Sequence, residues 1–157
     1  MISPAAAMQE ARRGLQNVRL EHDPPAAAAR AAGHAGTPLF VTRLDTPKHD
    51  YYLVPWQDQR GIVFVVQVDA WSGIMSSSAV LPSPLPRLVM SPEEARRLVA
   101  DRLGRTVIGE PDLVWQPCRE SASPLQPLYH VALDNGEAFV GVDGSIYPSL
   151  TPFGKGG

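Results

Sequence analysis

The strongest constraint on the fold is a helix start at Ser91. The run Ser91-Pro92-Glu93-Glu94 places a hydroxyl before a proline, with a glutamate three residues after the serine, which is the pattern of a capping box. Apolar residues then recur at helical spacing up to the glycine stop at residue 104; they are Ala95, Leu98, Val99 and Leu103. The spacing predicts an amphipathic helix over 92–103 whose apolar stripe is buried against another element.

Period-two patterns on both sides of this helix predict β-strands. The strongest is Ile62–Asp69, in which the alternate residues share the face that should meet the core; they are Ile62, Phe64, Val66 and Val68. Further strands are expected at 39–44, 51–56, 74–81, 113–116, 128–133, 137–143 and 146–150. Asp134-Asn135-Gly136 is typical of a tight hairpin turn, whereas the proline-rich run 82–86 is expected to be a connector outside the sheet.

The first 36 residues are expected to form a helical or mobile segment. Ser3-Pro4 predicts a helix start, followed by Ala7, Ala11 and Leu15 at helical spacing. A second alanine-rich run, 26–32, stops at a glycine. Because alanine side chains bury little apolar area, the sequence leaves open whether this segment docks or stays mobile.

The two halves of the chain echo each other. A shift of 74 residues pairs Leu39 with Leu113 and lays Val66-Gln67-Val68-Asp69 on Val140-Gly141-Val142-Asp143. The hairpin strands between them need a slip of about two residues, which we attribute to a longer first loop. Each half then has the order helix, strand, strand, strand, which predicts a duplication. About 60 residues is marginal for one such unit, so two units should stabilise one another.

The second half resembles a PepSY domain. The resemblance is carried by the helix start Ser91–Ala100, the paired strands around Leu128–Val131, and the closing strand Val140–Gly144. The first half is similar at its last strands, around 66–74, and the resemblance covers residues 25–150. It implies a small cystatin-like α+β fold, usually extracytoplasmic, in a family that holds, inhibits or accompanies peptidases and other partners. The family supplies no catalytic residues.

We therefore predict an α+β chain in which helices pack on antiparallel sheet, arranged as two tandem PepSY-like units. The expected segments are a helical or mobile segment at 1–36, a first unit at 37–86 with a helix starting near 25, a second unit at 87–150, and a flexible tail at 151–157.

Composition excludes several functional classes. Fourteen Lys and Arg against sixteen Asp and Glu give a net charge of −2, which argues against a nucleic-acid-binding protein. One cysteine excludes an intramolecular disulfide and a thiolate zinc cluster. No apolar run approaches the roughly 18 residues that a membrane helix needs. The N-terminus lacks the layout of a secretory signal, so the protein is either cytoplasmic or a mature fragment whose leader was removed.

The sequence offers no catalytic or metal-binding constellation. Cys118 has His130 on a nearby strand but no nucleophile signature around it, so we expect an inert thiol. The four histidines, at positions 22, 34, 49 and 130, show no metal-ligand spacing. Asp69 and Asp143 end strands, where an aspartate commonly accepts amide hydrogens of the following turn. We expect no enzyme activity, no metal and no cofactor.

The aromatic residues point to a binding role. Trp56, Trp71 and Trp115 are the candidate partner-binding residues, because tryptophan dominates binding hot spots when it is exposed. The expected partner is another protein, such as a peptidase, bound through a sheet face or an edge strand. The alternative is a ubiquitin-like modifier or sulfur carrier that uses the terminal Gly156-Gly157.

Overall fold

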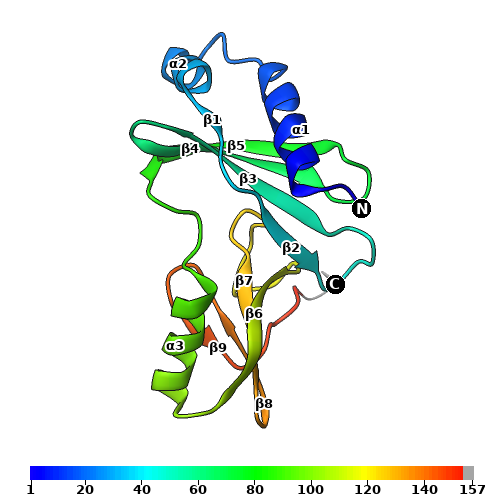
Figure 1. Cartoon of the computed structure of the whole chain (residues 1–157), viewed down its shortest axis with the longest axis vertical. Coiled ribbons are helices and arrows are strands. Elements are labelled where there is room, and N and C mark those ends of the chain that lie inside the picture. Colours follow the sequence, from blue (N-terminus) through cyan, green and yellow to red (C-terminus); the bar gives the residue numbers. More distant parts are fainter. Residues whose placement is uncertain (154–157) are drawn as a thin grey trace. The chain divides into compact units, whose positions relative to one another are not determined.

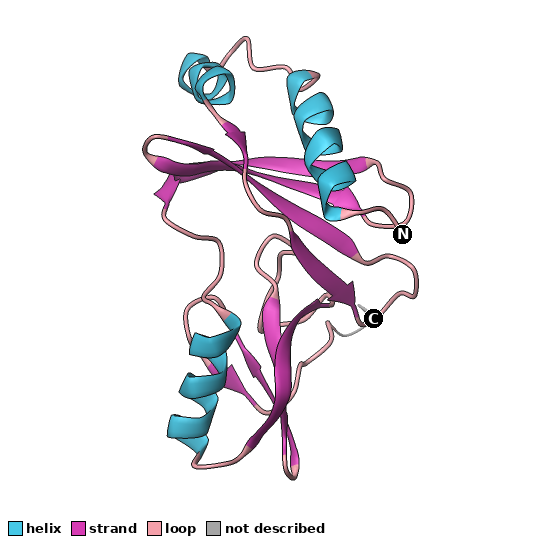
Figure 2. Ribbon diagram, in the orientation of Figure 1, coloured by secondary structure: helices cyan, strands magenta, loops and turns pink. Residues whose placement is uncertain are grey.

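The helices and strands fall into two units of a computed structural model that describes residues 1–153 (Figure 1). Unit 1 comprises Met1–Phe40 and Lys48–Leu88, and unit 2 comprises Val41–Pro47 and Val89–Gly157. Each unit packs helix against sheet that is mostly antiparallel, so the predicted α+β class is confirmed (Figure 2). Across the described residues, no helix combines the length and the apolar character needed to cross a membrane.

Unit 1 is an antiparallel meander with helices on one face. Its elements are α1 (Pro4–Gln16), α2 (Pro24–Ala32), β1 (His34–Ala35), β3 (Tyr51–Asp58), β4 (Gly61–Asp69) and β5 (Met75–Leu85). The strands lie in the order β5-β4-β3, and β1 pairs antiparallel with β3. Helix α1 packs against β3, β4 and β5, while α2 packs against β3.

The N-terminal segment docks as two capped helices. The Ser3 hydroxyl accepts from the Ala6 amide at 3.1 Å, and the Asp23 carboxylate caps α2 in the same way through the Ala26 amide at 3.1 Å. Small residues on the inner face of α1 let the helix approach the sheet closely. At Gly14 an added Cβ would lie 2.7 Å from the Met75 sulfur, so any larger residue would require the Met75 side chain to move. The alanines thus allow the helices to lie close to the sheet, whereas large side chains would bury more apolar area.

The core of unit 1 lies between these helices and β3–β4. Phe64, Val66 and Val68 of β4 are buried to 1% exposure or less and face the helices, as their alternation predicts. Val63 joins the same cluster because β4 carries an irregularity there: the pairing passes from Trp56↔Phe64 to Gln57↔Ile62. The extra residue shifts the alternation by one, so the prediction for Ile62 is wrong and Val63 takes its place in the cluster.

The prediction for the proline-rich run 82–86 is wrong. Pro82 and Pro84 lie inside β5, which continues to Leu85. This is possible because β5 is at the edge of the unit 1 sheet, where one side of the strand needs no partner. The pairing with β4 is also irregular here, passing from Phe64↔Val80 to Ile62↔Leu85, so the prolines occupy a bulged stretch.

Unit 2 is a second meander with one helix. Its elements are the end of β2 (Leu39–Arg43), α3 (Pro92–Leu103), β6 (Val107–Trp115), β7 (Leu128–Leu133), β8 (Gly136–Val140) and β9 (Ile146–Tyr147). The order is β2-β6-β7-β8-β9, and α3 packs against β6, β7 and β8. The expectation of a wholly antiparallel sheet is corrected here, because β2 and β6 pair in parallel, with Thr42 opposite Val114.

Helix α3 forms as its capping residues predict. The Ser91 hydroxyl accepts from the Glu94 amide at 3.1 Å, and Gly104 ends the helix in the left-handed conformation at φ 60°. Ala95 and Val99 are fully buried, whereas Leu103 at the end of the stripe is 43% exposed. The apolar stripe is therefore shorter than its spacing indicates.

The main hairpins of the two units are built alike. Asp58 pairs with Gly61 at the end of β3–β4, and Leu133 pairs with Gly136 at the end of β7–β8, so the two loops have equal length. Val66 follows Gly61 by five residues, whereas Val140 follows Gly136 by four. The slip between the halves is therefore one residue, and it comes from the β4 bulge at Val63 where a longer loop was expected.

Candidate functional site

Trp71 lies in a turn that Asp69 holds. Asp69 ends β4, and its Oδ1 accepts from the amides of Trp71 at 2.9 Å and Ser72 at 2.6 Å. The turn closes through the Gly73 amide, which donates to the Asp69 main-chain oxygen at 2.9 Å, with Gly73 at φ 73°. This confirms the predicted structural role of Asp69.

A hydrogen bond restrains the Trp71 side chain as well as its backbone. Its indole N–H donates to Oδ2 of Asp50 across 3.2 Å, and Asp50 also receives the Ala70 amide on its main-chain oxygen at 2.9 Å. The ring nevertheless stays 45% exposed, and Ile74 on the same turn is 60% exposed. A restrained aromatic ring with an open face is the kind of side chain that anchors protein interfaces.

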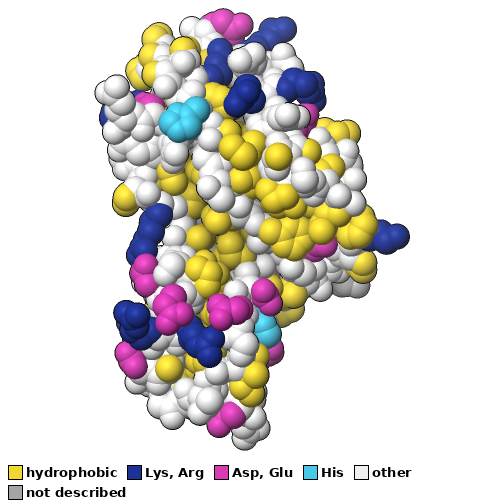
Figure 3. Space-filling view, in the orientation of Figure 1, with side chains coloured by type: hydrophobic (Ala, Val, Ile, Leu, Met, Phe, Trp, Pro, Cys, Tyr) yellow, Lys and Arg dark blue, Asp and Glu magenta, His cyan; other side chains and the backbone are white. Residues whose placement is uncertain are grey.

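The N-terminal residues pack beneath this turn. The Ile2 amide donates to the Ala70 oxygen at 2.8 Å, and the Tyr52 hydroxyl donates to the Ile2 oxygen at 3.1 Å. A Cβ added at Gly73 would lie 3.1 Å from Ile2. Figure 3 shows apolar surface gathered on unit 1 around the N-terminus. We call the exposed pair Trp71 and Ile74 the Trp71 surface.

The electrostatics of the turn favour a charged Asp69. Partial burial raises the pKa of Asp69, but the hydrogen bonds from the Ser72 and Trp71 amides outweigh it. The net result is a pKa below the ordinary value, so the carboxylate is ionised near neutral pH and the turn is held by charge-assisted bonds.

The structure places the other two predicted tryptophans in the interior, which corrects the expectation that they offer partner surface. Trp56 is 4% exposed and donates its indole N–H to the Arg30 oxygen at 3.2 Å. Trp115 is 5% exposed, donates to the Ser121 oxygen at 3.2 Å, and carries the Arg43 guanidinium 4.9 Å from its ring centroid. Both rings are buried and satisfied, so their contribution is to packing.

The turn after Asp143 in unit 2 shares with the Asp69 turn the bond from the amide two residues on, but it carries no aromatic residue. Oδ1 of Asp143 accepts from the Ser145 amide at 3.0 Å, and Gly144 has φ 84°. The hydrogen bond from the Ser145 amide, followed by that from its hydroxyl, lowers the pKa of Asp143 below its ordinary value. Val142 beside it is 39% exposed. The aspartate turn is thus a structural device in both units, and only the first presents a tryptophan.

Cys118 and the histidines do not form a catalytic group. Cys118 is fully buried, burial raises the pKa of its thiol, and its Sγ lies 3.6 Å from the Ser121 oxygen. His130 instead pairs with Glu137, with 2.7 Å between Nε2 and Oε2. Among residues 1–153, no three His, Cys, Asp or Glu side chains come together in a way that could hold a metal ion.

The surface of unit 2 carries an apolar groove of about 900 Å³ beside the C-terminal end of α3. Leu103, Leu133 and Tyr147 help to line it. Two arginines at its rim are tied to the main chain, Arg102 to the Gly144 oxygen at 3.0 Å and Arg105 to the Asn135 oxygen. The groove therefore presents mainly apolar surface, because both arginines at its rim are already hydrogen-bonded.

A second hollow, of about 600 Å³, lies in unit 1 where α1, α2 and β1 meet. Arg12, Arg30 and His34 line it together with Trp56. Sequence analysis did not identify this pocket, because its residues come from four separate elements and carry no shared motif. Only the helical spacing of Arg12 and Gln16 on α1 gives a local signal.

The predicted conjugation residues Gly156 and Gly157 lie outside the described residues. The chain matches no protein-family model, and comparisons with curated proteins and with solved structures found no match. The functional argument therefore depends on the geometry of the chain itself.

Proposed function

We propose that this chain is a non-catalytic protein-binding module whose contact surface centres on Trp71. The observation that carries the proposal is a tryptophan left 45% exposed although both its backbone and its indole N–H are fixed. Ordering a side chain costs free energy on binding, so a ring that is already held keeps more of its contact energy. The neighbouring Ile74 extends the apolar contact.

The finer form of the proposal is a tandem pair of PepSY-like units. It is supported by the equal hairpins at Gly61 and Gly136 and by the aspartate turns at Asp69 and Asp143, which follow them in the same order. A helix covers one face of the meander in each unit. In this form the module holds, inhibits or accompanies a peptidase, and that part of the proposal comes from the family resemblance.

The test compares the affinity of one purified partner for matched variants. A partner captured from the native host by the full chain is purified and titrated against the wild type, Trp71→Ala and Ile108→Ala. Ile108 is an apolar side chain of unit 2 that is 53% exposed, so its loss removes similar exposed surface elsewhere. We expect Trp71→Ala to weaken binding by roughly 10-fold or more and Ile108→Ala to leave it unchanged.

Two outcomes would contradict the proposal. Equal affinity of Trp71→Ala and wild type would show that Trp71 is not the contact. Loss of function on deletion of Gly156 and Gly157, with binding intact in Trp71→Ala, would favour the carrier alternative. If the partner is a peptidase, its rate of substrate hydrolysis should fall as the chain is added and should recover with Trp71→Ala.

A further inference from the structure

The pocket between α1, α2 and β1 gathers positive charge. Arg12, Arg30 and His34 line it with Gln16 and Trp56, and none of its lining residues is acidic. The whole chain has a net charge of −2, so a pocket without carboxylates is not a consequence of a basic surface. In Figure 3, Lys and Arg side chains gather over the part of unit 1 where the helices lie.

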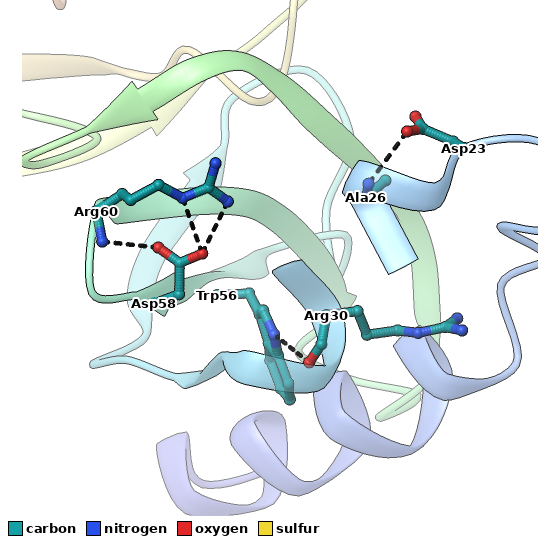
Figure 4. Close-up of polar contacts among 6 residues, drawn as sticks. All are labelled: Asp23, Ala26, Arg30, Trp56, Asp58 and Arg60. Carbon is teal, nitrogen blue, oxygen red and sulfur yellow. Dashed lines mark hydrogen bonds and ion pairs between the residues drawn. The ribbon is translucent and has the colours of Figure 1, made fainter. Parts of the chain in front are cut away.

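Arg30 is fixed in place at this pocket. One guanidinium nitrogen, Nη1, donates to the Leu15 oxygen at 3.1 Å and to the Val18 oxygen at 2.6 Å. Leu15 is in the last turn of α1 and Val18 follows the helix end, where the helix dipole is negative, so the contact also favours the helix end electrostatically. Figure 4 shows the Trp56 indole directed at the Arg30 main-chain oxygen while the Arg30 side chain extends away from that ring.

Arg12 supplies charge that the fold does not use. It is exposed on α1, and within residues 1–153 it makes no hydrogen bond or ion pair. Its neighbour Arg13 behaves differently, because its Nη2 lies 2.7 Å from Oε1 of Glu10. His34 adds an imidazole whose Nε2 lies 3.4 Å from the Gln57 amide nitrogen and accepts from it, which leaves Nδ1 as the N–H donor of the ring. The pocket thus combines the available guanidinium of Arg12 with an imidazole, while Arg30 lines it with its own guanidinium bonded to the end of α1.

We propose that this pocket binds the oxyanion group, phosphate or carboxylate, of a small ligand. A guanidinium presents parallel N–H donors that match two oxygens of either group, and an adjacent imidazole adds one more donor. The volume of about 600 Å³ is that of a small-molecule site, and the edge of the buried Trp56 closes one side. This inference concerns unit 1 alone and does not depend on the Trp71 surface.

The test titrates the full chain with inorganic phosphate and with citrate, using sodium chloride at matched ionic strength as the reference. Binding is followed by thermal stability and by tryptophan fluorescence. The fluorescence is measured in a Trp71→Phe background, which removes the exposed indole. Arg12→Gln and His34→Gln remove the proposed contacts. Arg19→Gln removes one exposed arginine outside the pocket and is the charge-matched control.

We expect a saturable rise in Tm together with a fluorescence change, because a ligand that binds the folded state stabilises it. Arg12→Gln should weaken the affinity about five- to tenfold, and Arg19→Gln should leave it unchanged. A response to phosphate alone assigns a phosphoryl ligand, and a response to citrate alone assigns a carboxylate ligand. The absence of a saturable response to either anion, or an equal response in Arg12→Gln and wild type, overturns the proposal.

Discussion

The indole N–H of Trp71 donates to the carboxylate of Asp50 across 3.2 Å and so ties a surface ring to the start of β3. The two residues are 21 positions apart in the chain. The contact restrains the ring although Trp71 remains 45% exposed. Under the proposed function, a tryptophan held in this way would contact a partner without loosening the turn that carries it.

Removing the Asp50 carboxylate should free the ring without unfolding unit 1. Asp50→Ala removes the indole acceptor but keeps the main-chain oxygen that receives the Ala70 amide. We expect one of the three indole N–H signals in an NMR spectrum to shift and to exchange faster with solvent, while the signals of Trp56 and Trp115 stay in place. Asp50→Asn, which retains an acceptor oxygen, should lie closer to the wild type. Unchanged signals for all three indoles would contradict the contact.

The aspartate turn at Asp69 should make stability depend on pH. The folded-state pKa is below the ordinary value of about 3.9, so the charged turn stabilises the fold above that pH and the contribution is lost as the pH falls through the folded pKa. We expect the free energy of unfolding of Asp69→Asn to be about 1–2 kcal/mol lower than that of the wild type at pH 7. The difference should approach zero near pH 2.

Urea unfolding between pH 7 and pH 2 measures this difference. Asp101→Asn on the exposed surface of α3 makes the same change of charge outside any turn and serves as the control. If the difference in unfolding free energy between Asp69→Asn and the wild type stayed constant over this range, the Asp69 charge would not be what stabilises the turn.

The Cys118 thiol should react slowly in the folded protein. It is fully buried and burial raises its pKa, so little thiolate is present and a reagent has no access. We expect labelling by a disulfide reagent at pH 8 to be on the order of 100-fold slower than in urea, because labelling requires local opening. Fast labelling of the native chain would show that this part of unit 2 opens readily.

The two hairpin glycines should respond differently to alanine. Gly61 and Gly136 have similar positive φ angles, 128° and 119°, so both substitutions strain the backbone. At Gly61 the new Cβ would also lie 2.7 Å from the Leu85 main-chain oxygen, whereas at Gly136 nothing lies within 4 Å. We expect Gly136→Ala to cost about 1 kcal/mol and Gly61→Ala roughly 2–3 kcal/mol. If both variants lost the same free energy of unfolding in denaturant, β5 would be able to move away from the added Cβ without a loss of stability.

Several parts of the fold could be predicted from local sequence. The start and end of α3 follow from Ser91 and Gly104, and the bounds of β7 and the turn before Gly136 follow from alternation and turn chemistry. The turn at Asp69 belongs to the same group. In the caps and turns the deciding bonds join residues two to four positions apart, and in β7 the signal is the alternation itself, so each signal lies within a short window of sequence.

The candidate site itself could be predicted only in part. Sequence singled out three tryptophans, but it could not distinguish the exposed Trp71 from the buried Trp56 and Trp115. It could not find the pocket at Arg12 and Arg30, because 18 positions separate these residues and two helices must dock before they meet.

The sequence by itself determined the helix starts, the hairpin and the aspartate turns of this protein. The tertiary structure alone decided that the prolines at 82 and 84 lie in an edge strand, that β2 pairs in parallel with β6, and that Trp71 keeps an open face. Caps and turns are closed by neighbouring residues, whereas strand order and burial depend on contacts between segments that are far apart in the chain.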